Sequence, residues 1–255
     1  MYLLTSSVKT EVVIGSQIVS SPRWMLDGRT VLLGPYYSSE EHEQYLGQTV
    51  GSTDWLWSAS DELRFDQKTL LLQSVSFGVP EANPPSTFSL NVWQTASEEV
   101  GLIRLLSTQN FELETTDFRW MDAQGKVLIC VNKHAVEDVS QHLKLRINEN
   151  MELLFADEKL CGWSLLQPTR FIVDAWEKPE IEIEDDEFTK LVSTYLSLFT
   201  EPYIEQMEDH NSQVLHALRE LYEHASSKDN YSSKRRSILR DATADKLDRF
   251  YDVKV

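Results

Sequence analysis

Two groups of side chains have the residue types that bind zinc. In "HALRELYEH", His216, Glu220 and His224 recur at intervals of four, so a helix would place them on one face. The same polar stripe continues toward the amino end of this segment, as it does on an ordinary solvent-exposed helix face. We therefore treat these three residues as weak metal candidates, and the sequence predicts no metal site and no cofactor.

The second group is Cys130, His134, His142 and Cys161, whose side chains also suit zinc. Their gaps do not match the closely spaced ligand pairs of structural zinc sites. In "KVLICVNK" the cysteine fits more simply as a small apolar residue on a strand. Two cysteines in 255 residues do not make a disulfide scaffold, which favours a reducing compartment.

Motifs with a known catalytic mechanism are incomplete, so no catalytic residue is predicted. A phosphate-binding loop around Gly125 would need a second glycine where Trp120 stands. Ser164 in "CGWSLL" would need a glycine two residues later to form a nucleophile elbow, and that position is leucine. Trp55 and Trp57 alternate and share one strand face, which is typical of a core and also of an aromatic binding platform.

The strongest chemical signal is negative charge. The stretch "EKPEIEIEDDEF", residues 177 to 188, contains seven carboxylates and one lysine. Its "EIEIE" alternates with period two, which predicts an extended segment with isoleucines on one side and carboxylates on the other. Such a row can dock a basic partner, and a charged linker or a charge-protected edge strand is the alternative. The predicted partner-binding residues are Glu180, Glu182, Glu184, Asp185, Asp186 and Glu187.

The charge is unevenly distributed along the chain. Residues 177–229 contain 14 acidic and 4 basic residues, whereas residues 230–255 contain 4 acidic and 7 basic ones. The basic end, with "KRR" at 234–236, can fold back and neutralise part of the acidic run. The total formal charge of −17 disfavours binding to nucleic acid or to an anionic membrane surface, and it favours encounter with a basic protein.

The elements that must carry these residues change character near Trp176. Before it, short runs rich in β-branched and aromatic residues alternate with turn signals and predict strands, among them "TEVVIGSQIVSS", "TFSLNVWQ", "VGLIRLLS" and "RFIVDAW". After it, helices are predicted from Asp185, from Pro202 and across "SSKRRSILRDATADKLDRFYDV". The sequence therefore predicts an α+β protein. Residues 1–176 would form a strand-rich antiparallel region, and residues 177–255 an acidic linker with helices.

Two stretches of the first region resemble each other. "RWMLDGRTVLL" from Arg23 and "RWMDAQGKVLI" from Arg119 both predict a hairpin, and each is followed by a polar, helix-like piece and a second hairpin. The second hairpins match when Phe65 is aligned with Phe155. Matching order and spacing predict a duplication of hairpin-helix-hairpin modules, at about residues 1–85 and 87–176. Chance similarity between short strand–turn–strand segments is the alternative.

These features lead to one expected function and one alternative. The amino end lacks the pattern of a signal peptide, and the apolar runs are shorter than the roughly 20 residues that span a bilayer, so we expect a cytoplasmic protein. The expected function is a non-enzymatic protein-binding module. An inhibitor or immunity-type protein that neutralises a basic partner such as a toxin fits best. The alternative is an enzyme whose site lacks a familiar motif, for example a metal-dependent one.

Overall fold

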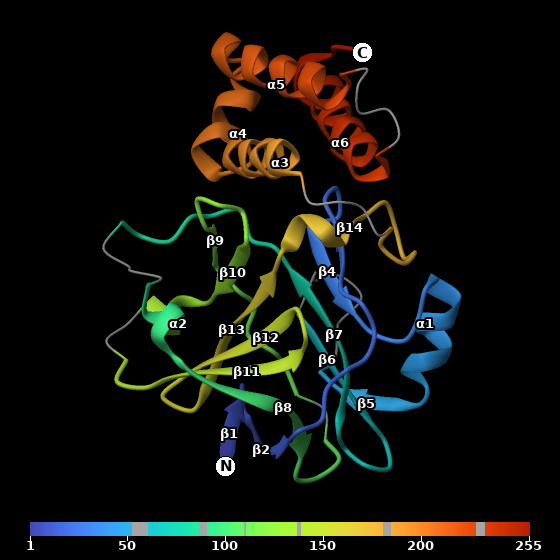
Figure 1. Ribbon diagram of the computed structural model, residues 1–255, viewed down its shortest axis with the longest axis vertical. Helices are drawn as coiled ribbons and strands as arrows, with labels where there is room; N and C mark the ends of the chain where they lie inside the picture. Colours follow the sequence, from blue (N-terminus) through green and yellow to red (C-terminus); the bar gives the residue numbers. More distant parts are fainter. Residues whose placement is uncertain (53–60, 87–90, 110, 137–138, 181–184, 228–232) are drawn as a thin grey trace.

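The computed structural model describes residues 1–52, 61–86, 91–109, 111–136, 139–180, 185–227 and 233–255. Strands occupy the amino-terminal part of the chain and four helices follow them (Figure 1), which confirms the predicted α+β class and its order. Among the helices of these residues, none combines the length and the hydrophobicity that crossing a bilayer requires.

The first sheet has the strand order β14-β3-β4-β7-β6-β5. Its strands follow the expected alternation: in β6, Leu63 and Phe65 are fully buried while their neighbours Glu62 and Arg64 are partly exposed. The strand bounds are β3 Arg23–Met25, β4 Thr30–Leu33, β5 Thr49–Gly51, β6 Glu62–Asp66, β7 Leu72–Gly78 and β14 Ile172–Val173.

The second sheet has the order β1-β2-β8-β11-β12-β13-β10-β9, and β1 also pairs with β13, so six of its strands close into a ring. Both sheets are mixed rather than purely antiparallel as predicted, because β8–β11, β1–β13 and β14–β3 are parallel pairs. Long connections permit such pairs, whereas tight hairpins cannot form them. The bounds are β1 Tyr2–Thr5, β2 Val8–Ile14, β8 Ser97–Leu105, β9 Phe118–Met121, β10 Val127–Val131, β11 His142–Asn148, β12 Met151–Ala156 and β13 Lys159–Leu166.

The two sheets contain the same arrangement of five consecutive strands. The order β3-β4-β7-β6-β5 in one sheet corresponds to β9-β10-β13-β12-β11 in the other. Every neighbouring pair within these two runs is antiparallel. The register also shifts at the same place, between Arg64 and Phe65 in β6 and between Leu154 and Phe155 in β12.

Several predicted elements differ from the structure. In the strands predicted across "TEVVIGSQIVSS" and "RFIVDAW", only residues 10–14 and 172–173 are in strands. The polar piece after the first hairpin forms the expected helix α1 Ser39–Leu46, but the piece from His134 forms only a 3-10 turn, η1 Lys133–Val136, before β11 begins. Pairing of β11 with β8 and β12 uses its backbone groups in the sheet instead of in a helix. The end of the predicted strand "TFSLNVWQ" is the short helix α2 Asn91–Thr95, and residues 87–90 lie outside the described part.

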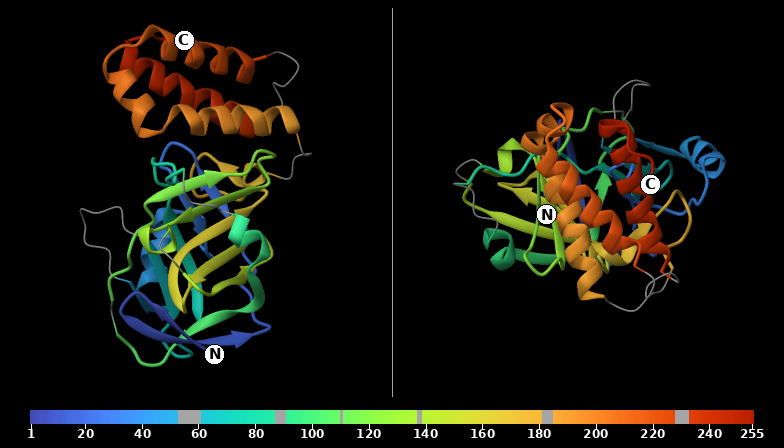
Figure 2. Two further views of the ribbon diagram at one scale, coloured as in Figure 1. Left: turned by 90° about the vertical axis from the view of Figure 1, so that its left-hand side faces the viewer. Right: turned by 90° about the horizontal axis from the view of Figure 1, so that it is seen from above.

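Four helices form a layer over one end of the strand-rich part (Figures 1 and 2). Asp185 and Ser233 cap the first and last of them, and Pro202 lies in the first turn of α4 as predicted. The predicted second helix is divided, because Asn211 caps a new helix with its side chain. The bounds are α3 Asp186–Leu198, α4 Glu201–Glu208, α5 Ser212–Ala225 and α6 Lys234–Tyr251, and a 3-10 turn, η2 Pro168–Phe171, leads into β14 below them.

The sheets and the helical layer share a continuous apolar core. Phe77 of the first sheet stacks on Trp163 of the second, with ring centroids 5.5 Å apart. Val192, Leu218 and Leu239 bring α3, α5 and α6 into the same cluster, and each is fully buried. The helices therefore have a fixed position over the sheet ends, where the charged residues of the next section lie.

Candidate functional site

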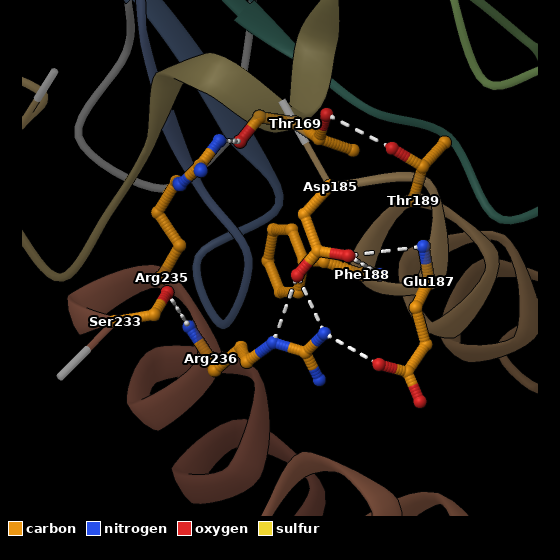
Figure 3. A network of polar contacts seen from close by, with 8 residues as sticks. All are labelled: Thr169, Asp185, Glu187, Phe188, Thr189, Ser233, Arg235 and Arg236. Carbon is orange, nitrogen blue, oxygen red and sulfur yellow. Dashed lines mark hydrogen bonds and ion pairs between the residues drawn. The ribbon is translucent and has the colours of Figure 1, made fainter. Parts of the chain in front are cut away.

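The acidic run meets the amino end of α6 through Asp185 (Figure 3). One oxygen of its carboxylate caps α3 by accepting from the N–H groups of Glu187 and Phe188, both at 3.0 Å. The other oxygen accepts from Nε and Nη2 of Arg236 at 3.1 and 2.5 Å. Nη2 also lies 3.0 Å from a carboxylate oxygen of Glu187. One arginine therefore binds two of the predicted partner-binding residues.

This ion pair is largely removed from solvent on the arginine side. The side chain of Arg236 is 2% exposed, while those of Asp185 and Glu187 are 32% and 62% exposed. Burial raises the pKa of Asp185, but the hydrogen bonds from Phe188 and Arg236 outweigh it, so the pKa lies below its usual value. The guanidiniums of Arg235 and Arg236 also lie 5.3 and 5.8 Å from the ring centroid of Phe188.

A second ion pair joins the start of the acidic run to the same helix. Glu177 lies 2.9 Å from Nζ of Lys234 and accepts from the N–H groups of Asp174 and Ala175. Burial opposes ionisation of Glu177, but these donors outweigh it and lower its pKa to about 2. The predicted return of the basic "KRR" segment onto the acidic run is therefore confirmed.

The six predicted partner-binding residues have different surroundings. Asp185 and Glu187 are held by Arg236. Glu180 and Asp186 are exposed and form no ion pair with any described residue. Glu182 and Glu184 lie outside the described residues.

Helix α4 carries an acidic face that sequence reasoning did not single out as a site. Glu201, Glu205, Glu208 and Asp209 recur at helical spacing and are all exposed. None of the four is in an ion pair with a residue that the structure describes, and the helix contains no basic residue. Tyr203, 41% exposed, lies in the same helix. The sequence signal that could have identified this face is the helical spacing of four acids with no lysine or arginine between them.

The zinc candidates on α5 do not converge on one point. Nε2 of His216 lies 3.3 Å from the carboxylate of Glu220, whereas Nδ1 of His224 lies 2.6 Å from the backbone oxygen of Glu220. Within the described parts of the chain, no three His, Cys, Asp or Glu side chains are grouped so that they could hold a metal ion.

The cysteines are separate, buried thiols. Cys161 donates to the backbone oxygen of Leu154, and Cys130 belongs to a different apolar cluster. Burial raises the pKa of both thiols, so they are neutral near pH 7. Trp55 and Trp57 lie outside the described residues.

Asp61 is a buried carboxyl group that sequence reasoning missed. It is 4% exposed, and one carboxyl oxygen accepts from the N–H of Gly78 at 2.7 Å. Burial raises its pKa to about 7, against the lowering effect of hydrogen bonds from Gly78 and Thr116. It lines a cavity of about 240 Å³ together with Arg29. One acid among 41 has no distinguishing sequence pattern, so only burial reveals it.

Comparisons with protein-family models, with curated protein sequences and with solved structures find no match. The function is therefore argued from the geometry of the chain.

Proposed function

We propose that the protein is a non-enzymatic, cytoplasmic protein-binding module of the inhibitor or immunity type, which neutralises a basic partner such as a toxin. The surface that engages the partner is the acidic face of α4, defined by Glu201, Glu205, Glu208 and Asp209. Glu180 and Asp186 of the acidic run provide a secondary contact, because they are exposed and form no ion pair with a described residue, although Glu180 acts on Lys234 from a longer distance.

The observation that carries this proposal is the contrast between two acidic segments. In the acidic run, Lys234 and Arg236 of the chain itself pair with three carboxylates. On α4 the four carboxylates have no such partner among the described residues. An external cation can therefore pair with them without first displacing an internal one.

Helix stability explains only part of the acidic face of α4, namely Glu201, which lies in the first turn, where the helix dipole favours negative charge. Like charges four residues apart destabilise a helix by about 0.2–0.5 kcal/mol per pair. Glu208 and Asp209 also lie at the carboxyl end of the helix, where the helix dipole disfavours negative charge. A charge of −17 on the chain adds long-range steering of a basic partner, which raises the association rate.

The test compares proteins captured from the native host by immobilised wild type and by the variant E201Q/E205Q/E208Q/D209N, at low and at high salt. We expect the wild type to retain a basic protein at low salt and the variant to bind it roughly ten- to hundredfold more weakly, since exposed charge pairs contribute about 0.2–1 kcal/mol each. Affinity is then measured with the purified partner.

The matched control is E40Q/E43Q/E99Q/E112Q, which removes the same charge from exposed acids of the strand-rich part. E180Q/D186N measures the secondary contact separately. If both four-charge variants bound the partner equally weakly, the total charge of the chain and not the acidic face of α4 would determine the affinity. A retained protein that is not basic, or binding that salt does not weaken, would contradict the proposal.

An enzyme is the alternative function, and Asp61 is the observation that favours it. A carboxyl group with a pKa of about 7, on the wall of a cavity that Arg29 also lines, has the properties of a general acid or base at neutral pH. The measurement of this pKa, described in the Discussion, tests the premise of this alternative.

We also infer that the strand-rich part contains a duplicated module, residues 23–78 and 119–166. The matched five-strand orders and the matched register shifts support this inference, although the second copy lacks the helix. The test is to build one sequence profile for each segment from related chains and to align the two profiles. We expect Arg23 to align with Arg119 and Phe65 with Phe155. Profiles that do not align, or that align in another register, would contradict the duplication.

A further inference from the structure

We propose that the cleft between the helical layer and the strand-rich part binds a small organic carboxylate with an apolar group, and that Arg119 receives the carboxylate. The cleft does not depend on the partner-binding role of α4, although Glu208 of the acidic face also lines it. The size of the cleft, the unused donors of Arg119 and the side chains that surround them support the proposal.

The cleft has a volume of about 490 Å³, within the range of small-molecule sites. Strand-rich segments contribute one wall and the helices α3, α4 and α6 contribute the other. Arg119 also lines a neighbouring cavity of about 220 Å³. Its guanidinium therefore borders open space, although the side chain as a whole is 3% exposed.

Arg119 uses only part of its hydrogen-bonding capacity. Nη2 donates to the backbone oxygens of Leu196 and Phe199, at 2.6 and 2.5 Å, at the carboxyl end of α3. Nη1 and Nε donate no hydrogen bond within the described parts of the chain, and no carboxylate there forms an ion pair with the guanidinium. Burial lowers the pKa of Arg119, but an arginine stays charged at neutral pH. Glu81, which is paired with Arg29, acts on this guanidinium only from beyond ion-pair distance. A buried cation without a directly bound anion is costly, so this position favours an anionic ligand.

The corresponding arginine of the first hairpin uses both of its terminal nitrogens within the chain, although its buried Nε has no hydrogen-bond partner among the described residues. Arg23 is fully buried, and its Nη1 and Nη2 donate to the backbone oxygens of Tyr36, Trp176 and Gly34. In Arg23 both terminal nitrogens donate, and together they have three acceptors. In Arg119 only Nη2 donates to a described residue, and it has two acceptors. The remaining donors of Arg119 match the two oxygens of a carboxylate, which arginine binds in a bidentate manner.

The other lining residues select the ligand class. Trp24, Leu26 and Phe199 provide apolar surface, which fits a hydrocarbon or aromatic group. Four acids also line the cleft, and a dianion such as phosphate would be repelled more strongly by them than a monocarboxylate. Three of these acids are paired with Arg29 or Lys246. The four acids are Asp27, Glu81, Glu208 and Asp245.

The experiment titrates the full chain with phenylbutyrate, with the neutral phenylbutanamide and with inorganic phosphate. Binding is followed by calorimetry and by the NMR signal of the Nε–H of Arg119. We expect phenylbutyrate to shift this signal, and the amide and phosphate to bind at least about tenfold more weakly. Arg119→Gln should weaken phenylbutyrate binding by a similar factor, while Arg219→Gln, on an exposed arginine outside the cleft, should not.

Because Arg119 also connects β9 to α3, its replacement can unfold the chain, so Ile204→Trp provides a second variant. Ile204 lines the cleft, and a larger side chain there should block phenylbutyrate without changing any charge. The proposal is overturned if phenylbutyrate leaves the Nε–H signal of the wild type unchanged. Equal binding of the amide, equal binding of phosphate, or full binding by Ile204→Trp would also overturn it.

Discussion

Replacing Asp185 by alanine is expected to lower the free energy of unfolding by about 2–4 kcal/mol. Helix α3 loses the side-chain acceptor for two N–H groups, which contributes about 1 kcal/mol. Arg236, 2% exposed, loses its nearest carboxylate, and a buried charge left alone is strongly destabilising. Glu187 remains as a partner at 3.0 Å, which keeps the loss below the value for a fully buried pair.

Three further variants separate these contributions in urea unfolding. Asp185→Asn keeps the cap and removes the charge, so we expect an intermediate loss. Glu187→Gln should cost less than about 1 kcal/mol because this carboxylate is 62% exposed. Asp186→Asn, the exposed neighbour, should change stability by less than about 0.5 kcal/mol. Equal effects at Asp185 and Asp186 would show that the pair with Arg236 does not stabilise the fold.

Lowering the pH should remove the contribution of the Asp185 carboxylate to the free energy of unfolding. Its pKa in the folded chain lies below the ordinary value of 3.8, so the folded state favours the ionised form. The stabilisation is present above the unfolded-state pKa and is lost as the pH falls through the folded-state pKa. The difference between wild type and Asp185→Asn should therefore shrink when unfolding is measured in acid.

Asp61→Asn is expected to stabilise the protein by about 1–3 kcal/mol above pH 7, because the wild type must keep a buried carboxylate ionised there. The amide oxygen can still accept from the N–H of Gly78, so the local hydrogen bond is retained. A folded-state pKa raised from 3.8 to about 7 means that the folded chain holds the proton more tightly. The contribution of Asp61 to the stability of the fold is therefore greatest below pH 3.8, and it is lost as the pH rises through about 7.

The measurement is the free energy of unfolding of wild type and Asp61→Asn across this pH range, together with NMR titration of the Asp61 carboxyl group. We expect the two profiles to meet in acid and to diverge toward neutral pH. Asp66→Asn is the matched control with the opposite sign, since hydrogen bonds from Thr69 lower the pKa of Asp66. Parallel profiles for wild type and Asp61→Asn, or an ordinary measured pKa, would contradict the expected burial effect and remove the support for an enzymatic site.

Short-range patterns predicted much of the secondary structure. The spacing of apolar residues predicted one inward face on α6, formed by Ile238, Leu239, Ala242, Leu247 and Phe250. Leu239, Ala242 and Leu247 are buried, and Ile238 and Phe250 are partly buried and pack against the core. Pro202 marked the first turn of α4. Such patterns involve residues within one or two helical turns of each other. They can therefore be recognised without knowing how the rest of the chain folds.

The same local reasoning was wrong where sheet pairing competes with helix formation. The segment from His134 was predicted as a helix, yet its last four residues, 142–145, belong to the strand β11, which pairs with β8 and β12. Strand formation depends on partners from other parts of the chain, which a single window of sequence does not contain. The short helix that ends with Thr95 was missed for the converse reason, since three of its five residues, Val92, Trp93 and Thr95, are strand formers by type.

The candidate sites divide in the same way. Composition and charge spacing were sufficient to locate the acidic run and the basic amino end of α6. They also predicted that these two segments attract each other. The choice of Arg236 for Asp185, 51 residues away, comes from the packing of α6 on α3 and β14. The burial of Asp61 and the open side of Arg119 likewise depend on the tertiary structure. Arg23 and Arg119 both begin an Arg-Trp-Met stretch of a predicted hairpin but differ in their acceptors. The acceptors belong to segments that meet them only in the folded chain, because burial and desolvation depend on all neighbours at once.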